Sequence, residues 1–115
     1  MKKILMVEDD LFISMINKKC LEQLGHNVVL VVRNGIDAIE ATKNLNPDVI
    51  LMDVRIAGEI DGIEAMEEIR KFSDVDVIYI SGDSDPETLL RAEKTRMLGF
   101  RIKPIFIDDL KDLLS

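Results

Sequence analysis

The sequence predicts an α/β fold, a doubly wound sheet of five parallel strands with helices on both faces. Short β-branched apolar runs alternate five times with longer stretches of helical periodicity. No Pro/Gly/Ser-rich linker, repeat or low-complexity segment interrupts this alternation, which is typical of wound α/β domains. A chain of 115 residues has room for one domain with a proper core, so residues 1–115 are expected to form one unit.

Hydrophobic periodicity gives the approximate positions of the elements. Strands are expected near residues 3–7, 27–32, 49–52, 77–81 and 100–102, and helices near 11–24, 35–45, 62–72, 86–97 and 107–114. The first, third and fourth strands are apolar almost throughout, as expected for strands covered on both faces. The second and fifth strands then lie at the edges. This favours the order 2-1-3-4-5 of flavodoxin-like folds, a (βα)5 three-layer sandwich.

Local signals mark the starts of several helices. Asp10 is expected to cap the first helix, and either Asn34 or Gly35 opens the second. The fourth helix begins near Pro86, with Ser84 or Asp85 as its cap; the sequence does not decide between the two.

One stripe of the first predicted helix is expected to pack into the core. Its members follow one another at i, i+4 spacing: Phe12, Ile16, Cys20 and Leu24. Cys20 is the only cysteine, which excludes an internal disulfide and any Cys-based metal cluster and agrees with a reducing compartment.

Composition argues against two classes of partner. The net charge of −7 disfavours direct binding to nucleic acid, which depends on clustered Lys and Arg. No apolar run approaches the roughly 20 residues that span a bilayer, and the Lys2-Lys3 start is unlike a signal peptide, so no membrane contact is expected. The sequence therefore predicts a cytoplasmic protein.

Polar groups stand where the apolar runs stop. Glu8 and Asp9 follow the first strand, Asp53 the third, Ser81 the fourth and Lys103 the fifth. Because parallel strands end at the same edge of a sheet, we expect these groups to converge in one cleft at the switch point between the first and third strands.

These residue types suit a divalent cation and a phosphoryl group. Three close carboxylates repel one another unless a cation compensates, and Mg²⁺ takes one or two carboxylates together with phosphate oxygens. Asp53 can act as a nucleophile on phosphorus, with Lys103 as a neutralising cation and Ser81 as a hydroxyl donor. Taken one by one, acids after a strand are more often helix caps and a strand-end Ser satisfies backbone groups; the five in register favour the phosphoryl site. The Lys103-Pro104 bond is a candidate for a cis peptide that aims the ammonium inward.

At this point the sequence resembles the CheY-like receiver domain of two-component response regulators. Five segments carry the resemblance in the right order and spacing, and they span nearly the whole chain: Ile4–Asp10, Asp48–Asp53, Asp61–Glu64, Val77–Gly82 and Gly99–Pro104.

The resemblance implies a role for each site residue. Glu8, Asp9, Asp53 and the backbone carbonyl of Arg55 would hold Mg²⁺, with Mn²⁺ as a substitute. Asp53 would accept a phosphoryl group from a sensor histidine kinase or a phosphotransfer protein, so the chain would not be an enzyme beyond its own phosphorylation and dephosphorylation. Lys103 would bind the phosphoryl group.

The resemblance also implies a switch. Ser81 and Phe100 would be the switch pair, which remodels the face formed by residues 86–97, 100–102 and 107–114. That face would contact a downstream effector protein, and the chain would be a monomer or a phosphorylation-linked dimer.

The sequence departs from the family pattern in several places. The stretch from Asp53 to Asp61 is one residue longer than the commonest form, and Ala57 stands where Pro is usual. Phe100 replaces the more frequent Tyr, so no hydroxyl needs a partner when the ring is buried. The last helix is short and leaves no room for an effector domain, so the chain is expected to be a stand-alone receiver or one excised from a larger protein.

Three other functions share part of this pattern. A Mg²⁺-dependent aspartyl phosphatase of the haloacid-dehalogenase type uses the same chemistry, but its Asp-x-Asp nucleophile follows the first strand, whereas Asp53-Val54-Arg55 follows the third. A flavin-binding module would need a phosphate loop where Glu8-Asp9-Asp10 would repel the phosphate. A receiver-like interaction domain that is never phosphorylated has no support among the site residues.

Finally, Arg55 and Asp83 are expected to face each other over the cleft mouth, because each lies two places after a strand-end site residue.

Overall fold

The computed structural model describes residues 1–115 and has the predicted sheet, with strand order β2-β1-β3-β4-β5 and every neighbouring pair parallel. The strands are β1 (Lys3–Val7), β2 (Asn27–Val32), β3 (Val49–Asp53), β4 (Asp76–Ser81) and β5 (Gly99–Ile102). The helices are α1 (Leu11–Gln23), α2 (Gly35–Leu45), α3 (Gly62–Ile69), α4 (Pro86–Glu93) and α5 (Ile107–Leu114).

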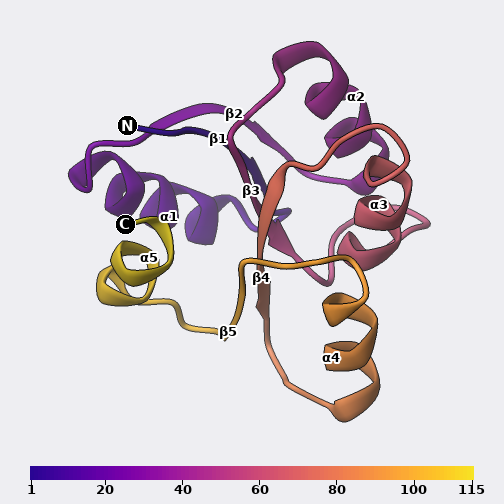
Figure 1. Ribbon diagram of the computed structural model, residues 1–115. Helices are drawn as coiled ribbons and strands as arrows, with labels where there is room; N and C mark the ends of the chain where they lie inside the picture. The colour runs from indigo at the N-terminus through magenta and orange to yellow at the C-terminus, as the bar shows by residue number, and fades with distance from the viewer.

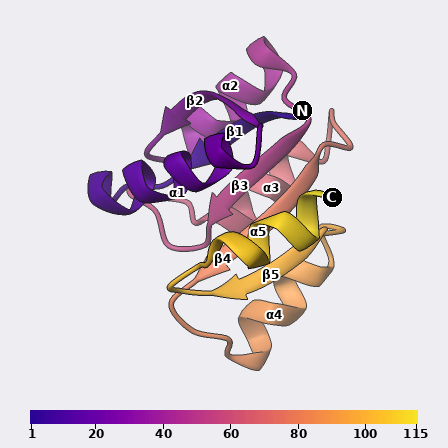
Figure 2. The same cartoon turned by 90° about the vertical axis from the view of Figure 1, so that its left-hand side faces the viewer.

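The sheet lies between two layers of helices (Figure 1). α1 and α5 cover one face, and Figure 2 shows them in front of the sheet; α2, α3 and α4 cover the other face. Each face buries its own apolar cluster. The α1/α5 side is packed by residues such as Ile4, Leu21, Leu51, Ile78 and Leu110. The opposite side is packed by residues such as Leu5, Ile50, Ile63, Met66 and Val77.

The strand register brings the predicted site residues to one edge. β1, β3 and β4 are interior strands and β2 and β5 are edge strands, as the hydrophobic pattern predicts. At the carboxyl ends, Asp53 pairs with Ile80 and Ser81 pairs with Ile102. The residues that follow these strands therefore lie side by side.

Helix caps resolve two alternatives that the sequence leaves open. Asp10 caps α1, because its carboxylate accepts the N–H groups of Phe12 and Ile13. Asn34, rather than Gly35, caps α2. Asp85 caps α4 by accepting the N–H of Thr88. In each case a short polar side chain satisfies donors that the first turn leaves unpaired.

Two helices are shorter than predicted. The expected helix 62–72 ends at Ile69, and the expected helix 86–97 ends at Glu93. After each end the backbone tightens into turns with i to i+3 hydrogen bonds, such as Phe72 N–H to the Ile69 carbonyl and Thr95 N–H to the Ala92 carbonyl. Arg96 then adopts a left-handed φ of 62°, which stops the second of these helices.

The apolar stripe predicted for the first helix is only partly in the core. Cys20 and Leu24 pack against the α1/α5 cluster, but Phe12 and Ile16 are 71% and 46% exposed. The residues that α1 buries are Ser14, Asn17 and Leu21. The amino-terminal half of α1 therefore presents polar side chains to the sheet edge, where the acidic residues lie.

Gly62 is the position at which the site is most sensitive to added volume. A Cβ at residue 62 would meet the backbone oxygen of Asp53 and lie 2.7 Å from the Cγ of Met52. We predict that Gly62→Ala lowers the free energy of unfolding by about 1–3 kcal/mol, because an extra carbon in a packed interior forces backbone shifts. Thermal unfolding followed by circular dichroism should show a drop of roughly 4–12 °C in Tm.

Gly82→Ala is the matched control. A Cβ at residue 82 has nothing within 4 Å, so its Tm should stay close to that of the parent protein. Equal Tm values for the two variants would show that the α3 amino terminus does not press on Asp53.

Candidate phosphoryl-transfer site

The carboxyl edge of the sheet gathers five predicted site residues. Glu8 and Asp9 follow β1, Asp53 and Ser81 are the last residues of β3 and β4, and Lys103 follows β5. Glu8 and Asp53 are each 3% exposed, which is rare for carboxylates and requires compensating partners.

The ammonium of Lys103 supplies that compensation. Its Nζ lies 2.7 Å from Asp53 Oδ2 and 3.3 Å from Glu8 Oε1. The remaining oxygens accept backbone donors: Asp53 Oδ1 from the N–H of Arg55 and Glu8 Oε2 from the N–H of Asp10, both at 3.1 Å. One cation thus serves two buried acids. The Lys103-Pro104 peptide is cis, in line with the sequence prediction.

These contacts perturb the acid–base properties of the site. Burial, together with the hydrogen bond and negative charge of Asp53, raises the pKa of Glu8 to about 7. Burial by itself would lower the pKa of the Lys103 ammonium, but its hydrogen bond to Asp53 and the charges of Asp53 and Glu8 raise that pKa overall. Lys103 therefore stays charged, and negative charge in the site exceeds positive charge at neutral pH.

The same acids form a donor set for a hard cation. One carboxylate oxygen from each of Glu8, Asp9 and Asp53 lies within 4.8 Å of the others. Carboxylate oxygens are the ligands that Mg²⁺ prefers, and a divalent ion would offset the burial and the negative charge of Asp53 that raise the pKa of Glu8. The residues present therefore fit a magnesium ion.

Ser81 and Phe100, the expected switch pair, occupy different surroundings. The hydroxyl of Ser81 is buried and accepts the N–H of Asp83 at 3.2 Å. Phe100 on β5 is half-buried, and its ring centroid lies 6.2 Å from that of Tyr79 on β4. Neither side chain is hydrogen-bonded to Asp53.

Arg55 and Asp83 face each other across the mouth of the site, as predicted. Arg55 Nη2 lies 3.3 Å from Asp83 Oδ2, and the two side chains are 76% and 51% exposed. An ion pair this exposed contributes little to the free energy of unfolding, so any functional importance comes from its position at the mouth of the site.

The longer loop after Asp53 is held without disturbing that residue. Ala57 forms an isolated parallel bridge with Asn34, and Gly58 takes a φ of 96° that favours glycine. The N–H of Gly62 returns to the carbonyl of Val54 at 2.8 Å. The extra residue is therefore accommodated between residues 55 and 61.

Two residues near the site were not singled out from the sequence. Arg33, the first residue after β2, donates from Nη2 to the main-chain carbonyl of Asp9 at 3.3 Å. The strand-end argument that found the other five would have found it. Asn17 on α1 lies beside Glu8 and Asp53 under the site. Its signal is weaker, because helical periodicity alone does not tell a buried polar residue from an exposed one.

Comparison with known proteins agrees with this geometry. The sequence matches the response regulator receiver domain family over residues 4–115. It is 32% identical over 104 residues to the chemotaxis protein CheY of Thermotoga maritima, covering 90% of this chain and 86% of that protein. It is 35% identical over 113 residues to the transcriptional regulatory protein ZraR of Klebsiella oxytoca, covering 97% of this chain.

A solved structure shows the same fold. The signal receiver domain of a modulated diguanylate cyclase from Desulfovibrio desulfuricans G20 has a TM-score of 0.91 and 30% identity, covering 99% of this chain and 90% of that one. This chain spans 25% of ZraR and 50% of the DctR response regulators that it also matches. These matches favour a two-component receiver over the phosphatase alternative. The chain belongs to the response regulator receiver domain family.

Proposed function

We propose that the chain accepts a phosphoryl group on Asp53 from a phosphohistidine and uses it to switch a protein-binding face. The observation that carries this proposal is the contact of the Lys103 ammonium with Asp53 and Glu8, at 2.7 and 3.3 Å, beside a third carboxylate. A nucleophile, a cation and a metal-ligand set within one cleft are the groups that phosphoryl transfer needs.

Glu8, Asp9, Asp53 and the backbone carbonyl of Arg55 would hold Mg²⁺, with Mn²⁺ as a substitute. The ion would neutralise phosphoryl oxygens and orient them for in-line transfer. The residues of the chain supply the rest. The hydrogen bond from the Arg55 N–H orients the Asp53 carboxylate, and the Lys103 ammonium contacts that carboxylate at 2.7 Å and balances its charge.

In the transfer step, an oxygen of Asp53 forms a bond to phosphorus while the bond from phosphorus to the donor nitrogen breaks. The electron pair of the broken bond stays on the imidazole of the donor. Lys103 and the hydroxyl of Ser81 would donate hydrogen bonds to two of the phosphoryl oxygens. The product is an acyl phosphate, which a water molecule can later hydrolyse at phosphorus.

Phosphorylation would act through Ser81 and Phe100. Ser81 would exchange its hydrogen bond with Asp83 for one to the phosphoryl group, and the half-buried ring of Phe100 would move inward. These movements would change the face formed by α4, β5 and α5. We infer that a sensor histidine kinase or phosphotransfer protein supplies the phosphoryl group and that an effector protein reads the changed face.

Location and assembly stay predictions. None of the helices combines the length and the apolar character that crossing a bilayer requires. We propose a cytoplasmic protein that works as a monomer or as a phosphorylation-linked dimer, without direct binding to nucleic acid.

Mg²⁺ should stabilise the fold, because a ligand that binds only the native state shifts unfolding by mass action. At ten times its dissociation constant the ion adds about 1.4 kcal/mol, which raises Tm by roughly 6 °C. Asp9→Ala should abolish the rise, while Asp112→Ala, which removes an exposed acid of α5, should keep it. A Tm that does not change from zero to tens of millimolar Mg²⁺ would contradict the metal assignment.

Asp53 should be the one acceptor for small donors such as acetyl phosphate. Intact mass spectrometry should show the addition of one phosphoryl group to the parent protein and to Asp83→Ala, and none to Asp53→Asn. Labelling of Asp53→Asn at the parental rate would mean that another residue is the acceptor. Absence of labelling in the parent protein, with Mg²⁺ present, would favour an interaction domain that is never phosphorylated.

Arg55 should protect the acyl phosphate. Hydrolysis needs a water in line with the Asp53 oxygen and phosphorus, and the guanidinium paired with Asp83 at the mouth of the site would obstruct that approach. Arg55→Ala should shorten the lifetime of the phosphorylated protein several-fold, and Asp83→Ala should do so less strongly by freeing the arginine. Release of radiolabelled phosphate measures both, with Arg96→Ala, an exposed arginine paired with Asp74, as control. Equal or slower hydrolysis in Arg55→Ala would rule out this role.

A further inference from the structure

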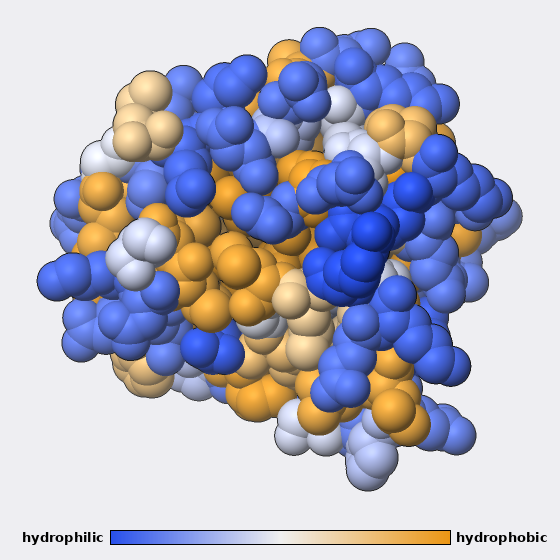
Figure 3. Space-filling view, in the orientation of Figure 1, coloured by the Kyte–Doolittle hydropathy of each residue, from blue (hydrophilic) through white to orange (hydrophobic).

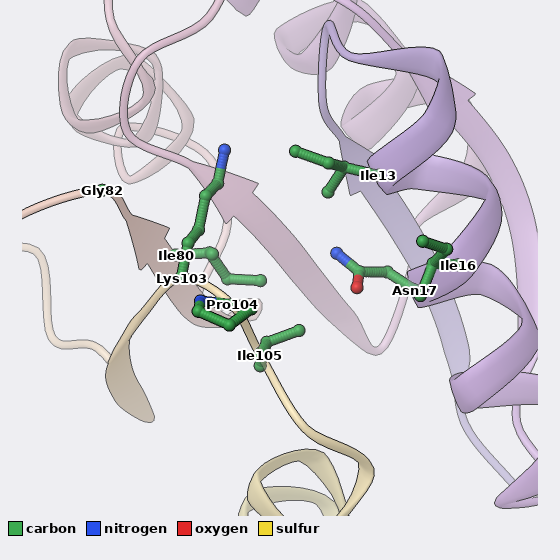
Figure 4. A pocket seen from close by; sticks show the side chains of 8 residues that line it. All are labelled: Ile13, Ile16, Asn17, Ile80, Gly82, Lys103, Pro104 and Ile105. Atoms are coloured by element: carbon green, nitrogen blue, oxygen red, sulfur yellow. The ribbon is translucent and has the colours of Figure 1, made fainter.

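A cavity of about 400 Å³ lies between α1 and the carboxyl ends of β4 and β5. Figure 4 shows its two walls, with side chains of α1 on one side and those of β4 and the segment after β5 on the other. Its volume is within the range of sites that hold small organic ligands. The lining residues are Ile13, Ile16, Asn17, Ile80, Gly82, Lys103, Pro104 and Ile105.

The walls of this cavity are mainly aliphatic. Four isoleucines and Pro104 form most of its surface. In the space-filling view, apolar side chains gather between α1 and β5 and are bordered by polar residues (Figure 3). An apolar area of this kind next to a polar rim is typical of a ligand site.

Asn17 is the polar group of the cavity. The residue is only 4% exposed, and it lines the cavity. In Figure 4 its amide extends from α1 toward the opposite wall. Every fully enclosed side-chain polar atom of the protein has a partner, and the Asn17 amide, which lines the cavity, offers a polar group that can hydrogen-bond to water or to a bound molecule.

Charge selects the kind of occupant. Lys103 offers the cavity its aliphatic stem, because its ammonium is held by Asp53 and Glu8. Those two acids and Asp9 lie together next to the Lys103 ammonium, so negative charge predominates at this end of the cavity. The whole chain also carries a net charge of −7. An anion would be repelled and would find no free cation in the cavity.

We propose that this cavity binds a small neutral molecule, mostly apolar, with one hydrogen-bonding group directed at the Asn17 amide. The isoleucines supply the apolar contact and Asn17 supplies orientation. This site goes beyond phosphoryl transfer. It can be tested on the unphosphorylated protein without metal, so the outcome is independent of the role of Asp53.

Three related probes test the proposal: indole, which is neutral and has one N–H donor; N-methylindole, which lacks that donor; and indole-3-carboxylate, which is an anion. Each is titrated into protein with labelled isoleucine methyl groups and followed by NMR. We expect indole to shift the methyl signals of Ile13, Ile80 and Ile105, with a dissociation constant on the order of 1 mM. N-methylindole should bind about fivefold more weakly and the carboxylate more weakly still.

Asn17→Leu separates the hydrogen bond from the difference in probe size. In this variant indole should lose its advantage over N-methylindole, while the amide spectrum shows that the fold is kept. Ile13→Phe, which fills the cavity, should prevent binding of all three probes. Ile36→Phe, at an exposed isoleucine of α2, is the matched control and should leave the affinities unchanged.

Three results would overturn the proposal. One is the absence of isoleucine shifts at 10 mM indole, about ten times the expected dissociation constant. Another is a preference for indole over N-methylindole that survives in Asn17→Leu. The third is that the isoleucine methyl signals shift when a phosphohistidine-bearing protein is added but not with any of the three probes. That result would mean that the cavity receives a side chain of the partner protein.

Discussion

The site depends on one ammonium that makes two buried carboxylates tolerable. A parallel sheet brings its strand ends to one edge, and here that edge holds Glu8 and Asp53, each 3% exposed. Without a cation the burial and mutual repulsion of these two carboxylates would be uncompensated. Lys103 reaches both acids, and its own N–H donates to the carbonyl of Ser81 at 2.7 Å, which fixes where its side chain starts. The short edge strand β5 thus carries the cation on which the interior strands rely.

A second constraint fixes the far end of α4, an element of the proposed switch face. The guanidinium of Arg70 donates to the carbonyl of Thr95 at 2.6 Å and to that of Arg96 at 3.2 Å. The hydroxyl of Thr95 lies 2.6 Å from that of Tyr79, whose burial raises its pKa to about 12 and keeps it neutral. Tyr79 also contacts the ring of Phe100. The half-buried ring of Phe100 is therefore connected through Tyr79 to the anchored end of α4, whereas the amino terminus of that helix is held by its own cap.

The sequence predicts the parts of this structure that depend on strand patterning. Strand order and the meeting of Glu8, Asp53 and Lys103 follow from which runs are apolar and where they stop. The predicted ends of α3 and α4 were wrong, because long-range contacts decide where these two helices stop. Arg70, just after α3, donates a hydrogen bond to the carbonyl of Thr95 in the turn after α4, 25 positions away. No local sequence signal indicates this contact. The burial of Ser14 and Asn17 on α1 was not predicted either, because the periodicity argument assumes that the inward face of a helix is apolar.

That failure on α1 is itself informative. Ser14 and Asn17 occupy inward positions at which helical periodicity predicts apolar residues. Their polar groups differ in where they can find hydrogen-bond partners. The hydroxyl of Ser14 donates to the carbonyl of Leu11 at 2.9 Å, a local solution that needs nothing from elsewhere in the fold. The amide of Asn17 instead lines the cavity beside Lys103, where water or a bound molecule can hydrogen-bond to it. A polar residue is tolerated at this inward position because the part of α1 that carries it borders a cavity rather than the close-packed core.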